Sequence, residues 1–357
     1  MKIILQFFLC LCLFAGCKAK LSSDYMCFDY IKYIDKCPQS IRLKFGKKID
    51  LGMIGCRDLF IYDSLMIIST SNSNGFWSFF SLPNLEHKGD FLLKGNGPNE
   101  FVTPPWVGQA SFRLENGQTN IYISDNQKGR LLRMHMDKTF DLNELSITNK
   151  CDTLPPLLFN FVYIDSTTYL CRTIAATQAK QERFLLKDGH RERPECLEYL
   201  NRAHVTPNSG NYNILSAIIK YSQHNNMVVE MPVGLNYLNM YTLDGSVTRT
   251  LCIGRELYNI DELQNMDHWE RPYTFANLKL YDTFWGVLYI GETNKSFQTK
   301  RKNNPKIYLF DWQGQPKIEL QLPHYATTFD IDVRNGILYT IDHVTENVYC
   351  YEIKNLI

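Results

Sequence analysis

The chain has 357 residues, 13% of them aromatic, and its 38 Lys and Arg residues balance 37 Asp and Glu residues to a formal net charge of +1. This balance excludes the strongly basic face that nucleic-acid binding requires, so we expect no nucleic-acid partner. The length exceeds the size at which a single hydrophobic core normally stops growing, yet no linker rich in Pro, Gly or Ser divides the chain.

The first residues have the pattern of an export signal. Residues 3–16 are almost wholly apolar and follow a basic start at Lys2, and this stretch is too short to span a membrane. Residues 14–17, Phe-Ala-Gly-Cys, resemble a bacterial lipobox in which Phe replaces the usual Leu. We therefore expect a signal peptide over residues 1–16 and a lipid on Cys17, with an ordinary signal peptide as the alternative.

A lipid on Cys17 makes the membrane an expected partner. The next residues, Lys-Ala-Lys at 18–20, include neither the Asp that signals inner-membrane retention nor an acidic tract for surface export. We expect an outer-membrane lipoprotein that faces the periplasm rather than the cell surface. Residues 17–38 would form an N-terminal tether, and residues 39–357 the folded domain.

The rest of the chain has the composition of an all-β protein. Short runs rich in Ile, Tyr, Phe, Leu and Val are bounded by Asn, Asp and Gly. Helical patterns occur only near residues 195–202 and 260–269. The residues that precede Asp125 and Asp342 share one pattern, in which a strand ends at the Asp, a polar turn follows and a second strand begins. We expect both Asp side chains to accept backbone N–H groups in these turns.

Hairpin turns recur at intervals of roughly 50 to 70 residues, the period of a propeller. The five turns lie at residues 82–84, 136–138, 187–189, 243–245 and 312–314. Each turn accounts for one blade, and residues 329–357 supply three strands of a sixth. Residues 41–45 form a spare strand that could complete this last blade and remove the exposed sheet edges. We predict a six-bladed β-propeller with four-stranded blades, closed by that N-terminal strand.

Two motifs resemble those of a known family. Residues 94–101, Lys-Gly-Asn-Gly-Pro-Asn-Glu-Phe, are similar to the Gly-x-Gly-Pro-x-Glu-Phe signature of the TolB-like six-bladed propeller lipoproteins of bacteria, although Asn99 stands where many members have Gly. Residues 288–291, Leu-Tyr-Ile-Gly, resemble an aromatic strand of the fifth blade. The resemblance implies the propeller fold and a periplasmic or surface setting, without an established substrate.

The first motif has a structural interpretation. Gly95 and Gly97 permit backbone angles closed to other residues, and Pro98 restricts one more. Glu100 is expected to accept backbone N–H groups within the loop, and Phe101 to pack between neighbouring blades. Phosphate binding is not expected, because the run lacks the Lys and the following helix that a phosphate loop needs.

No common catalytic or metal-binding motif occurs in the sequence. The eight His residues are scattered, so we expect neither a metal nor another cofactor. Residues 330–332, Asp-Ile-Asp, resemble the start of a calcium loop, but the apolar residues among them belong to a strand. Cys171, Cys252 and Cys350 lie in apolar runs and are expected to be small hydrophobic side chains, so we assign no disulfide framework.

A ligand would bind where the loops between successive blades meet, at one mouth of the ring. The longest of these loops, residues 254–277, is too long and too aromatic for a simple connection. Rings could stack on a sugar or anchor a partner protein, and arginines could hold an anion. The candidate ligand contacts are Trp106, Tyr212, Arg255, Trp269, Arg271 and Tyr273.

These candidates favour a non-catalytic binding or scaffold protein whose partner is a glycan or an envelope protein. The alternative for each ring is that it caps the core. The alternative for the whole protein is a carbohydrate-active enzyme, a hydrolase or lyase, that uses loop carboxylates such as Glu100, Asp261 and Glu270. Clustered acids at the mouth would favour the enzyme, whereas an aromatic and neutral mouth would favour binding.

Overall fold

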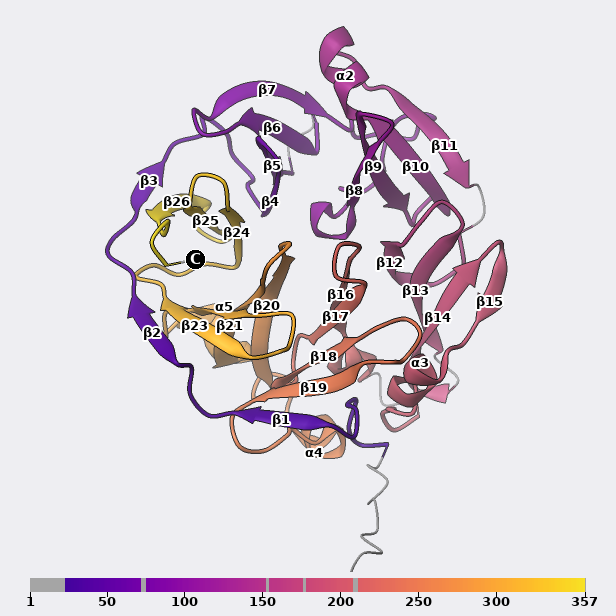
Figure 1. Ribbon diagram of the computed structural model, residues 1–357, viewed down its shortest axis with the longest axis vertical. Helices are drawn as coiled ribbons and strands as arrows, with labels where there is room; N and C mark the ends of the chain where they lie inside the picture. Colours follow the sequence, from indigo (N-terminus) through magenta and orange to yellow (C-terminus); the bar gives the residue numbers. More distant parts are fainter. Residues whose placement is uncertain (1–22, 72–74, 152–153, 176–177, 208–210, 357) are drawn as a thin grey trace, which may run out of the picture.

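The computed structural model describes residues 23–71, 75–151, 154–175, 178–207 and 211–356. Six sheets are arranged around a central axis, so the protein is a six-bladed β-propeller, as predicted (Figure 1). The expected signal peptide and the expected lipid site at Cys17 lie outside the described residues. Within the described part of the chain, every helix falls short of the length and apolar character that a membrane crossing needs.

The first three blades are each formed from four consecutive strands. Blade one contains β4 (Asp58–Tyr62), β5 (Leu65–Ser69), β6 (Trp77–Ser81) and β7 (Glu86–Phe91). Blade two contains β8 (Ser111–Glu115), β9 (Gln118–Asp125), β10 (Arg130–His135) and β11 (Ile147–Cys151). Blade three contains β12 (Leu158–Tyr163), β13 (Thr168–Ala175), β14 (Lys180–Lys187) and β15 (His190–Glu192).

Each of the last three blades also includes a strand from the N-terminal segment. Blade four contains β16 (Ala217–Ser222), β17 (Met227–Pro232), β18 (Tyr237–Tyr241) and β19 (Thr248–Ile253). Blade five contains β20 (Pro272–Leu280), β21 (Trp285–Thr293), β22 (Lys306–Phe310) and β23 (Pro316–Gln321). Blade six contains β24 (Thr328–Asp332), β25 (Ile337–Asp342) and β26 (Asn347–Glu352).

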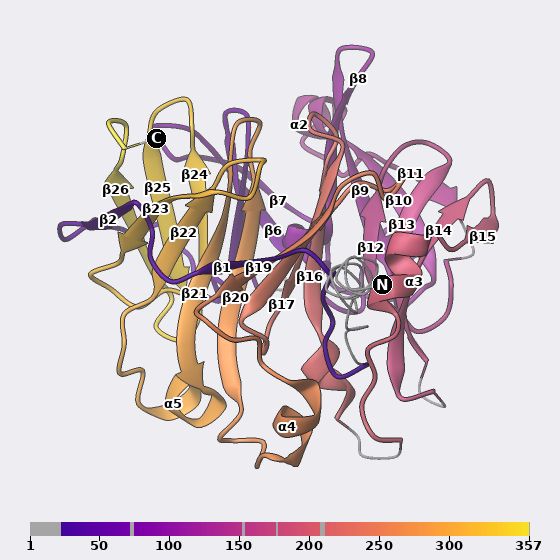
Figure 2. The same ribbon diagram turned by 60° about the horizontal axis from the view of Figure 1, so that its bottom comes forward.

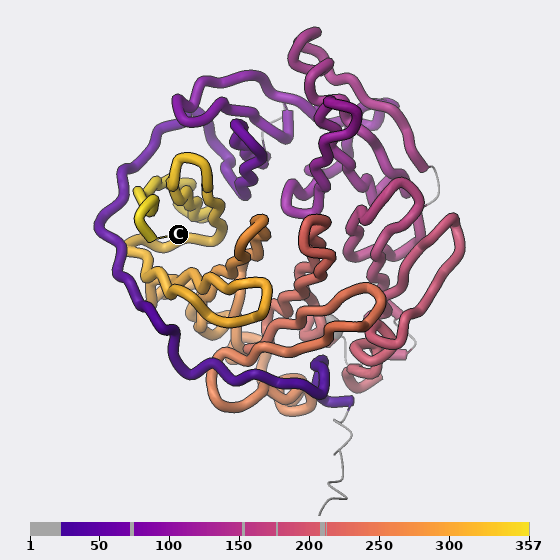
Figure 3. Tube along the Cα trace, in the orientation of Figure 1, coloured from indigo at the N-terminus to yellow at the C-terminus, as the bar shows by residue number. Residues whose placement is uncertain are grey.

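The N-terminal segment forms a belt around the outside of these three blades (Figure 3). β1 (Ile31–Ile34) pairs in parallel with β19, and β2 (Gln39–Arg42) pairs in parallel with β23. β3 (Lys47–Ile49) pairs antiparallel with β26 and is the fourth strand of blade six. Closure by an N-terminal strand is therefore confirmed.

The residues that we assigned to this closure were wrong. Ile41 and Arg42 belong to β2 and pair with blade five, and the backbone N–H of Leu43 continues that pairing by bonding to Gln321 O. Phe45 is 83% exposed between two blades. Gly46 lies against the Tyr351 ring, where a Cβ atom would come within 2.5 Å of a ring carbon. The chain therefore leaves blade five after Leu43 and pairs with blade six from Lys47 onwards.

The belt begins before the residues that we assigned to the folded domain. Met26, Cys27 and Phe28 are 0–3% exposed and pack between blades three and four. The N–H of Met26 donates to Tyr237 Oη at 3.1 Å, and that of Phe28 donates to Thr250 Oγ1 at 2.8 Å. Part of the expected tether thus contributes to the core.

Apolar side chains fill the spaces between neighbouring blades, one cluster for each pair. A middle strand such as β17 is buried along its whole length because its two faces contact different blades. This explains why the sequence shows short continuous apolar runs rather than strict alternation. Cys171 and Cys252 are buried in these clusters and Cys350 is half-buried, and the eight cysteines of the described residues are free thiols.

The predicted turns lie between the third and fourth strands of blades one to five, with one difference. Residues 136–138 begin a helix, α2 (Met136–Leu142), rather than a tight turn. The Asp turns are confirmed, because Asp125 accepts the N–H of Lys128 and Asp342 accepts the N–H of Val344. The predicted helices are also present. Besides α2, the helices of the described residues are η1 (Val107–Gln109), α3 (Glu195–Leu200), η3 (Tyr212–Leu215), α4 (Ile260–Asn265) and α5 (Asn294–Thr299).

Candidate functional site

One end of the propeller carries the loops that join each outer strand to the next inner strand. Helices α4 and α5 extend from this end (Figure 2). An open cavity of about 350 Å³ lies here among the first residues of the inner strands, and we call it the mouth cavity. Its lining includes Arg57, Asp58, Trp106, Tyr273, Asn277, Thr328 and His343.

Trp106 presents a ring to the mouth cavity in a fixed orientation. Its side chain is 38% exposed, and its Nε1–H donates to Asp58 Oδ2 at 2.9 Å. The preceding residue is held as well, because Trp77 Nε1–H donates to Pro105 O at 2.9 Å. A Cβ atom on Gly108 would lie 2.9 Å from Trp106 Nε1, so only glycine leaves room for this ring position. The ring is thus preorganised for stacking.

Asp58 is the carboxylate that orients this ring. It is 7% exposed, and its Oδ1 accepts the N–H of Leu59 at 2.8 Å and the hydroxyl of Thr328. Among the described lining residues, Asp58 is the one carboxylate of the mouth cavity. Glycoside hydrolysis by the usual route needs two. The described lining residues therefore do not include the acid pair that the hydrolase form of the enzyme alternative requires.

Two further side chains of the mouth cavity are neutral around pH 7. Tyr273 stacks on Phe297 of α5 with ring centroids 4.1 Å apart, and burial raises the pKa of its hydroxyl to about 12. Burial lowers the pKa of His343 below the usual value for histidine. The mouth therefore combines aromatic rings and uncharged hydrogen-bonding groups with one cation, Arg57, and one carboxylate, Asp58.

Asn277 supplies an unused acceptor. Its Oδ1 is buried and has no hydrogen-bond partner among the described residues, and its side chain lines the mouth cavity. The pairing of β20 with β21 shifts register between Tyr273 and Asn277, and such irregularities redirect side chains. An unsatisfied buried polar atom costs about 1–3 kcal/mol, which a ligand donor at this position would offset.

Polar side chains close the axis of the ring beneath the mouth cavity. Lys279 and Asp330, both 2% exposed, come from β20 and β24, and their Nζ and Oδ2 atoms are 3.0 Å apart. Asp330 also accepts the Tyr281 hydroxyl at 2.8 Å and the N–H of Ile61 at 2.9 Å. The described residues contain no group of three or more His, Cys, Asp or Glu side chains that could hold a metal.

A family model described as TolB-like 6-blade propeller-like matches residues 57–334. The chain belongs to this family. A member of the DUF4221 family from Bacteroides vulgatus has a similar fold, with a TM-score of 0.54, 10% identity and coverage of 87% of this chain and 94% of that one. The sequence matches none of the curated proteins with which it was compared.

Two other solved structures align over similar lengths. One is a protein of Bacteroides fragilis thought to be exported, with a TM-score of 0.46, 11% identity and coverage of 87% of both chains. The other is a calcium-binding protein, regucalcin, from Agrobacterium tumefaciens, with a TM-score of 0.44, 8% identity and coverage of 88% of this chain and 95% of that one.

The signature motif of this TolB-like propeller lies between blades one and two. Glu100 Oε2 accepts the N–H of Gly97 at 2.8 Å, and Phe101 is 1% exposed within the cluster that joins the two blades. The reason that we gave for the glycines was wrong, because neither has a φ in the left-handed region. A Cβ atom on Gly95 would instead overlap the Glu100 carboxylate. The glycines leave space for that side chain.

The other candidate contacts of this TolB-like propeller lie outside the mouth cavity. Arg255 is 81% exposed and pairs with Asp35 of the belt at 2.7 Å. Trp269 is 49% exposed and contacts His268 edge-to-face. Arg271 donates to backbone oxygens of its own loop and, with Tyr273, lines a neighbouring cavity of about 220 Å³.

Of the six candidates, the structure brings Trp106 and Tyr273 together in the mouth cavity. The backbone of Tyr212 lies in η3, but its side chain is outside the described part. Sequence reasoning missed Asp58, Asn277 and His343. Asp58 and Asn277 lie on strands whose sequence patterns resemble those of the other blades, so no local sequence signal distinguishes these residues.

Proposed function

We propose that this TolB-like propeller is a lipid-anchored, non-catalytic binding protein of the bacterial envelope, and that its mouth cavity binds a saccharide unit of a glycan. The observation that carries the proposal is the pairing of a fixed, exposed Trp106 ring with the unsatisfied Asn277 Oδ1 in one cavity. Sugars offer an apolar ring face for stacking and hydroxyl donors for such an acceptor.

The chemistry of the cavity supports binding rather than turnover. Its one carboxylate, Asp58, already accepts three hydrogen bonds from the protein. Tyr273 and Thr328 offer neutral hydroxyl groups. Arg57 and Asp58 are the charged side chains of the described lining, and their opposite charges leave no net charge, which suits an uncharged polar ligand.

The envelope location in this proposal rests on the first residues of the sequence. Residues 1–16 have the signal pattern, and Cys17 follows the lipobox-like run. We propose anchoring to the outer membrane with the propeller in the periplasm. Fractionation of cells that express the full chain tests this, because Cys17→Ser should move the protein from the membrane to the soluble fraction. An unchanged membrane fraction in that variant would refute the lipid anchor.

Saccharide binding is tested on the purified propeller with a panel of envelope and host oligosaccharides, followed by titration calorimetry on any that bind. We expect Trp106→Ala to weaken binding by about tenfold, which corresponds to about 1.4 kcal/mol. Trp106→Phe keeps a ring but removes the N–H to Asp58, so it should retain part of the affinity. Asn277→Leu should weaken binding through the lost acceptor.

Trp269→Ala is the matched control, because it removes an exposed tryptophan outside the mouth cavity. The proposal fails if no oligosaccharide of the panel binds, or if Trp106→Ala and Trp269→Ala weaken binding equally. Capture of an envelope protein that Trp106→Ala abolishes, without any saccharide binding, would instead identify the mouth as a protein-docking site.

A further inference from the structure

A second cavity, of about 490 Å³, opens at the opposite end of the axis from the mouth cavity. It lies among the inner strands of blades one to five, near the hairpin of β8 that extends away from α4 and α5 (Figure 2). Aromatic rings form part of its walls, with Phe60, Tyr62, Phe112 and Tyr221 among them. Phe112 stacks on both Phe60 and Tyr62, with ring centroids 4.5 and 5.1 Å apart.

Two cations face this second cavity, and neither forms an ion pair with a carboxylate of the described residues. Lys220 Nζ donates to Gly108 O at 2.7 Å and lies 5.3 Å from the centre of the Phe60 ring. Arg113 donates to two backbone oxygens at 3.0 Å, and its buried Nε–H has no partner. Neither charge therefore has a carboxylate in direct contact with it among the described residues.

The acids near Lys220 are already engaged elsewhere. Asp330 is paired with Lys279, and Asp58 holds Trp106. The carboxylate that lines the second cavity is Asp282, an exposed residue just after the end of β20. At pH 6, where Lys220 is mostly protonated, two cations and one carboxylate leave a net charge of about +1 among the described lining residues, before any charge on His224 is counted.

We propose that the second cavity binds a small monoanionic carboxylic acid with an aromatic or apolar body, its carboxylate beside Lys220 and Arg113. The net charge of the cavity matches one negative charge better than the two of a dianion such as sulfate. The stacked rings suit an apolar body, and a partly desolvated ammonium gains more from a carboxylate than an exposed one does. The two cavities share no lining residue among those described, so this site is distinct from the mouth cavity.

The proposal predicts a proton uptake on ligand binding that depends on pH. Burial, followed by the charge of Lys279, lowers the pKa of Lys220 to about 7, whereas Asp58 and Asp330 act in the opposite direction. A bound carboxylate would raise this pKa again. Binding should therefore take up a proton near pH 8, where free Lys220 is mostly neutral, and take up almost none at pH 6. Asp282 and His224 face the same cavity, so their variants serve as controls for the assignment of that proton.

Titration calorimetry with benzoate at pH 6 is the direct experiment, with sulfate as the doubly charged comparison anion. We expect saturable binding of one benzoate, weakened at least about tenfold in Lys220→Gln and in Arg113→Gln. Lys187→Gln, which removes an exposed lysine outside the cavity, should bind as the unmodified protein does. Lys220→Met keeps the apolar stem and shows whether a loss of binding reflects the charge.

Several results would overturn the proposal. These are no saturable binding of benzoate up to about 10 mM, equal affinities in Lys220→Gln and Lys187→Gln, or tighter binding of sulfate than of benzoate. Proton uptake at pH 8 that persists in Lys220→Met would also contradict it. Saccharide binding at the mouth cavity is measured separately, so failure here leaves that proposal intact.

Discussion

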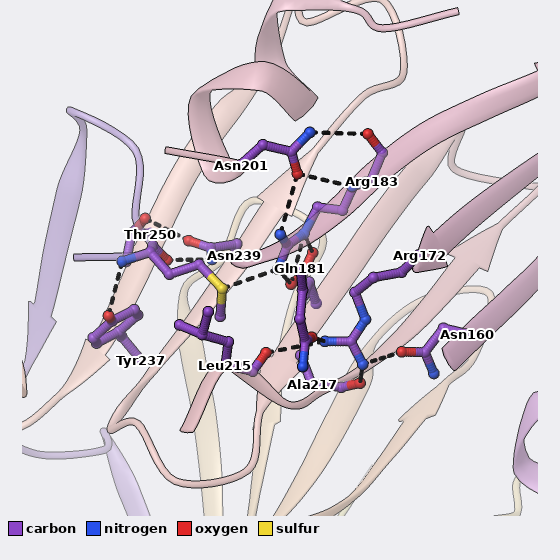
Figure 4. A network of polar contacts seen from close by, with 12 residues as sticks. Asn160, Arg172, Gln181, Arg183, Asn201, Leu215, Ala217, Tyr237, Asn239 and Thr250 are labelled. Atoms are coloured by element: carbon purple, nitrogen blue, oxygen red, sulfur yellow. Dashed lines mark hydrogen bonds and ion pairs between the residues drawn. The ribbon is translucent and has the colours of Figure 1, made fainter. Parts of the chain in front are cut away.

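The most buried charges of the propeller join blades three and four (Figure 4). Arg183 and Glu230 are 1% and 0% exposed, and Arg183 Nε donates to both carboxylate oxygens at 3.0 and 2.9 Å. Asn201 completes the pair by accepting the N–H of Arg183 at 2.8 Å. A second arginine, Arg172, is also fully buried but bonds only to neutral oxygens, two of which are Gln181 Oε1 and Leu215 O.

Glu230 is the carboxylate of this network. Burial and the charge of Arg183 lower the pKa of Arg172 to about 9, and Glu230 acts in the opposite direction. Replacing Glu230 by Leu leaves two guanidinium groups in the interior with no negative charge beside them. Removing one partner of a buried pair typically costs about 3–5 kcal/mol. We expect the upper half of this range, because Arg172 loses compensation as well as Arg183.

Urea unfolding at pH 7 of Glu230→Leu, Arg183→Met and the double variant measures this cost. The double variant removes both charges of the pair, so it should be at least about 2 kcal/mol more stable than Glu230→Leu. Asp63→Asn is the control, since it breaks an ion pair with Arg334 whose side chains are 59% and 62% exposed. That change should cost at most about 1 kcal/mol. A loss below about 1 kcal/mol in Glu230→Leu, or a double variant no more stable than it, would refute the reasoning.

Three more predictions concern the belt, the second cavity and the family motif. Phe28→Ala should lower the free energy of unfolding by about 3–5 kcal/mol and expose the N-terminal segment to proteases, whereas Phe45→Ala, at an 83% exposed ring, should change neither. Lys220→Met should stabilise the protein by about 2 kcal/mol at pH 6. Below pH 7 the Lys220 ammonium is charged in both the folded and the unfolded chain, so folding must desolvate a charge. This free-energy cost disappears as pH rises from about 7 towards 10.5, so the urea midpoints of Lys220→Met and the unmodified protein should converge over that range. Gly95→Ala should cost about 1–3 kcal/mol in thermal or urea unfolding because its Cβ overlaps the Glu100 carboxylate, and full stability in this variant would contradict that contact.

The belt illustrates where prediction from sequence ended. Residues 41–45 have an alternating apolar pattern, which suggested the closing strand, yet β3 (Lys47–Ile49) is more polar and closes the ring. Each belt strand adds three or four residues at the outer edge of a blade, so its own side chains contribute little to the choice of partner. The positions of the blade edges, and the length of chain between them, decide which residues pair.

In the mouth cavity, too, some residues could be predicted from the sequence and others could not. Trp106 and Tyr273 were predictable, because both are aromatic residues in or beside loops that a propeller gathers at one end. Arg255 looked equally suitable but pairs with Asp35, a residue brought beside it only by the pairing of β1 with blade four. The position of the Asn277 side chain depends on an irregular stretch of β20, and no residue type in the strand indicates that irregularity.

The sequence by itself determined the number of blades, the four-stranded pattern of a blade, and the positions of most turns. These follow from local preferences, since turn residues and short apolar runs act over a few neighbours. Only the tertiary structure decided which blade each belt strand joins, which polar groups stay unpaired, and that Lys220 and Arg113 face one cavity without a carboxylate partner. Such properties depend on which side chains from distant strands meet around the axis, and burial then sets what each of their charges costs.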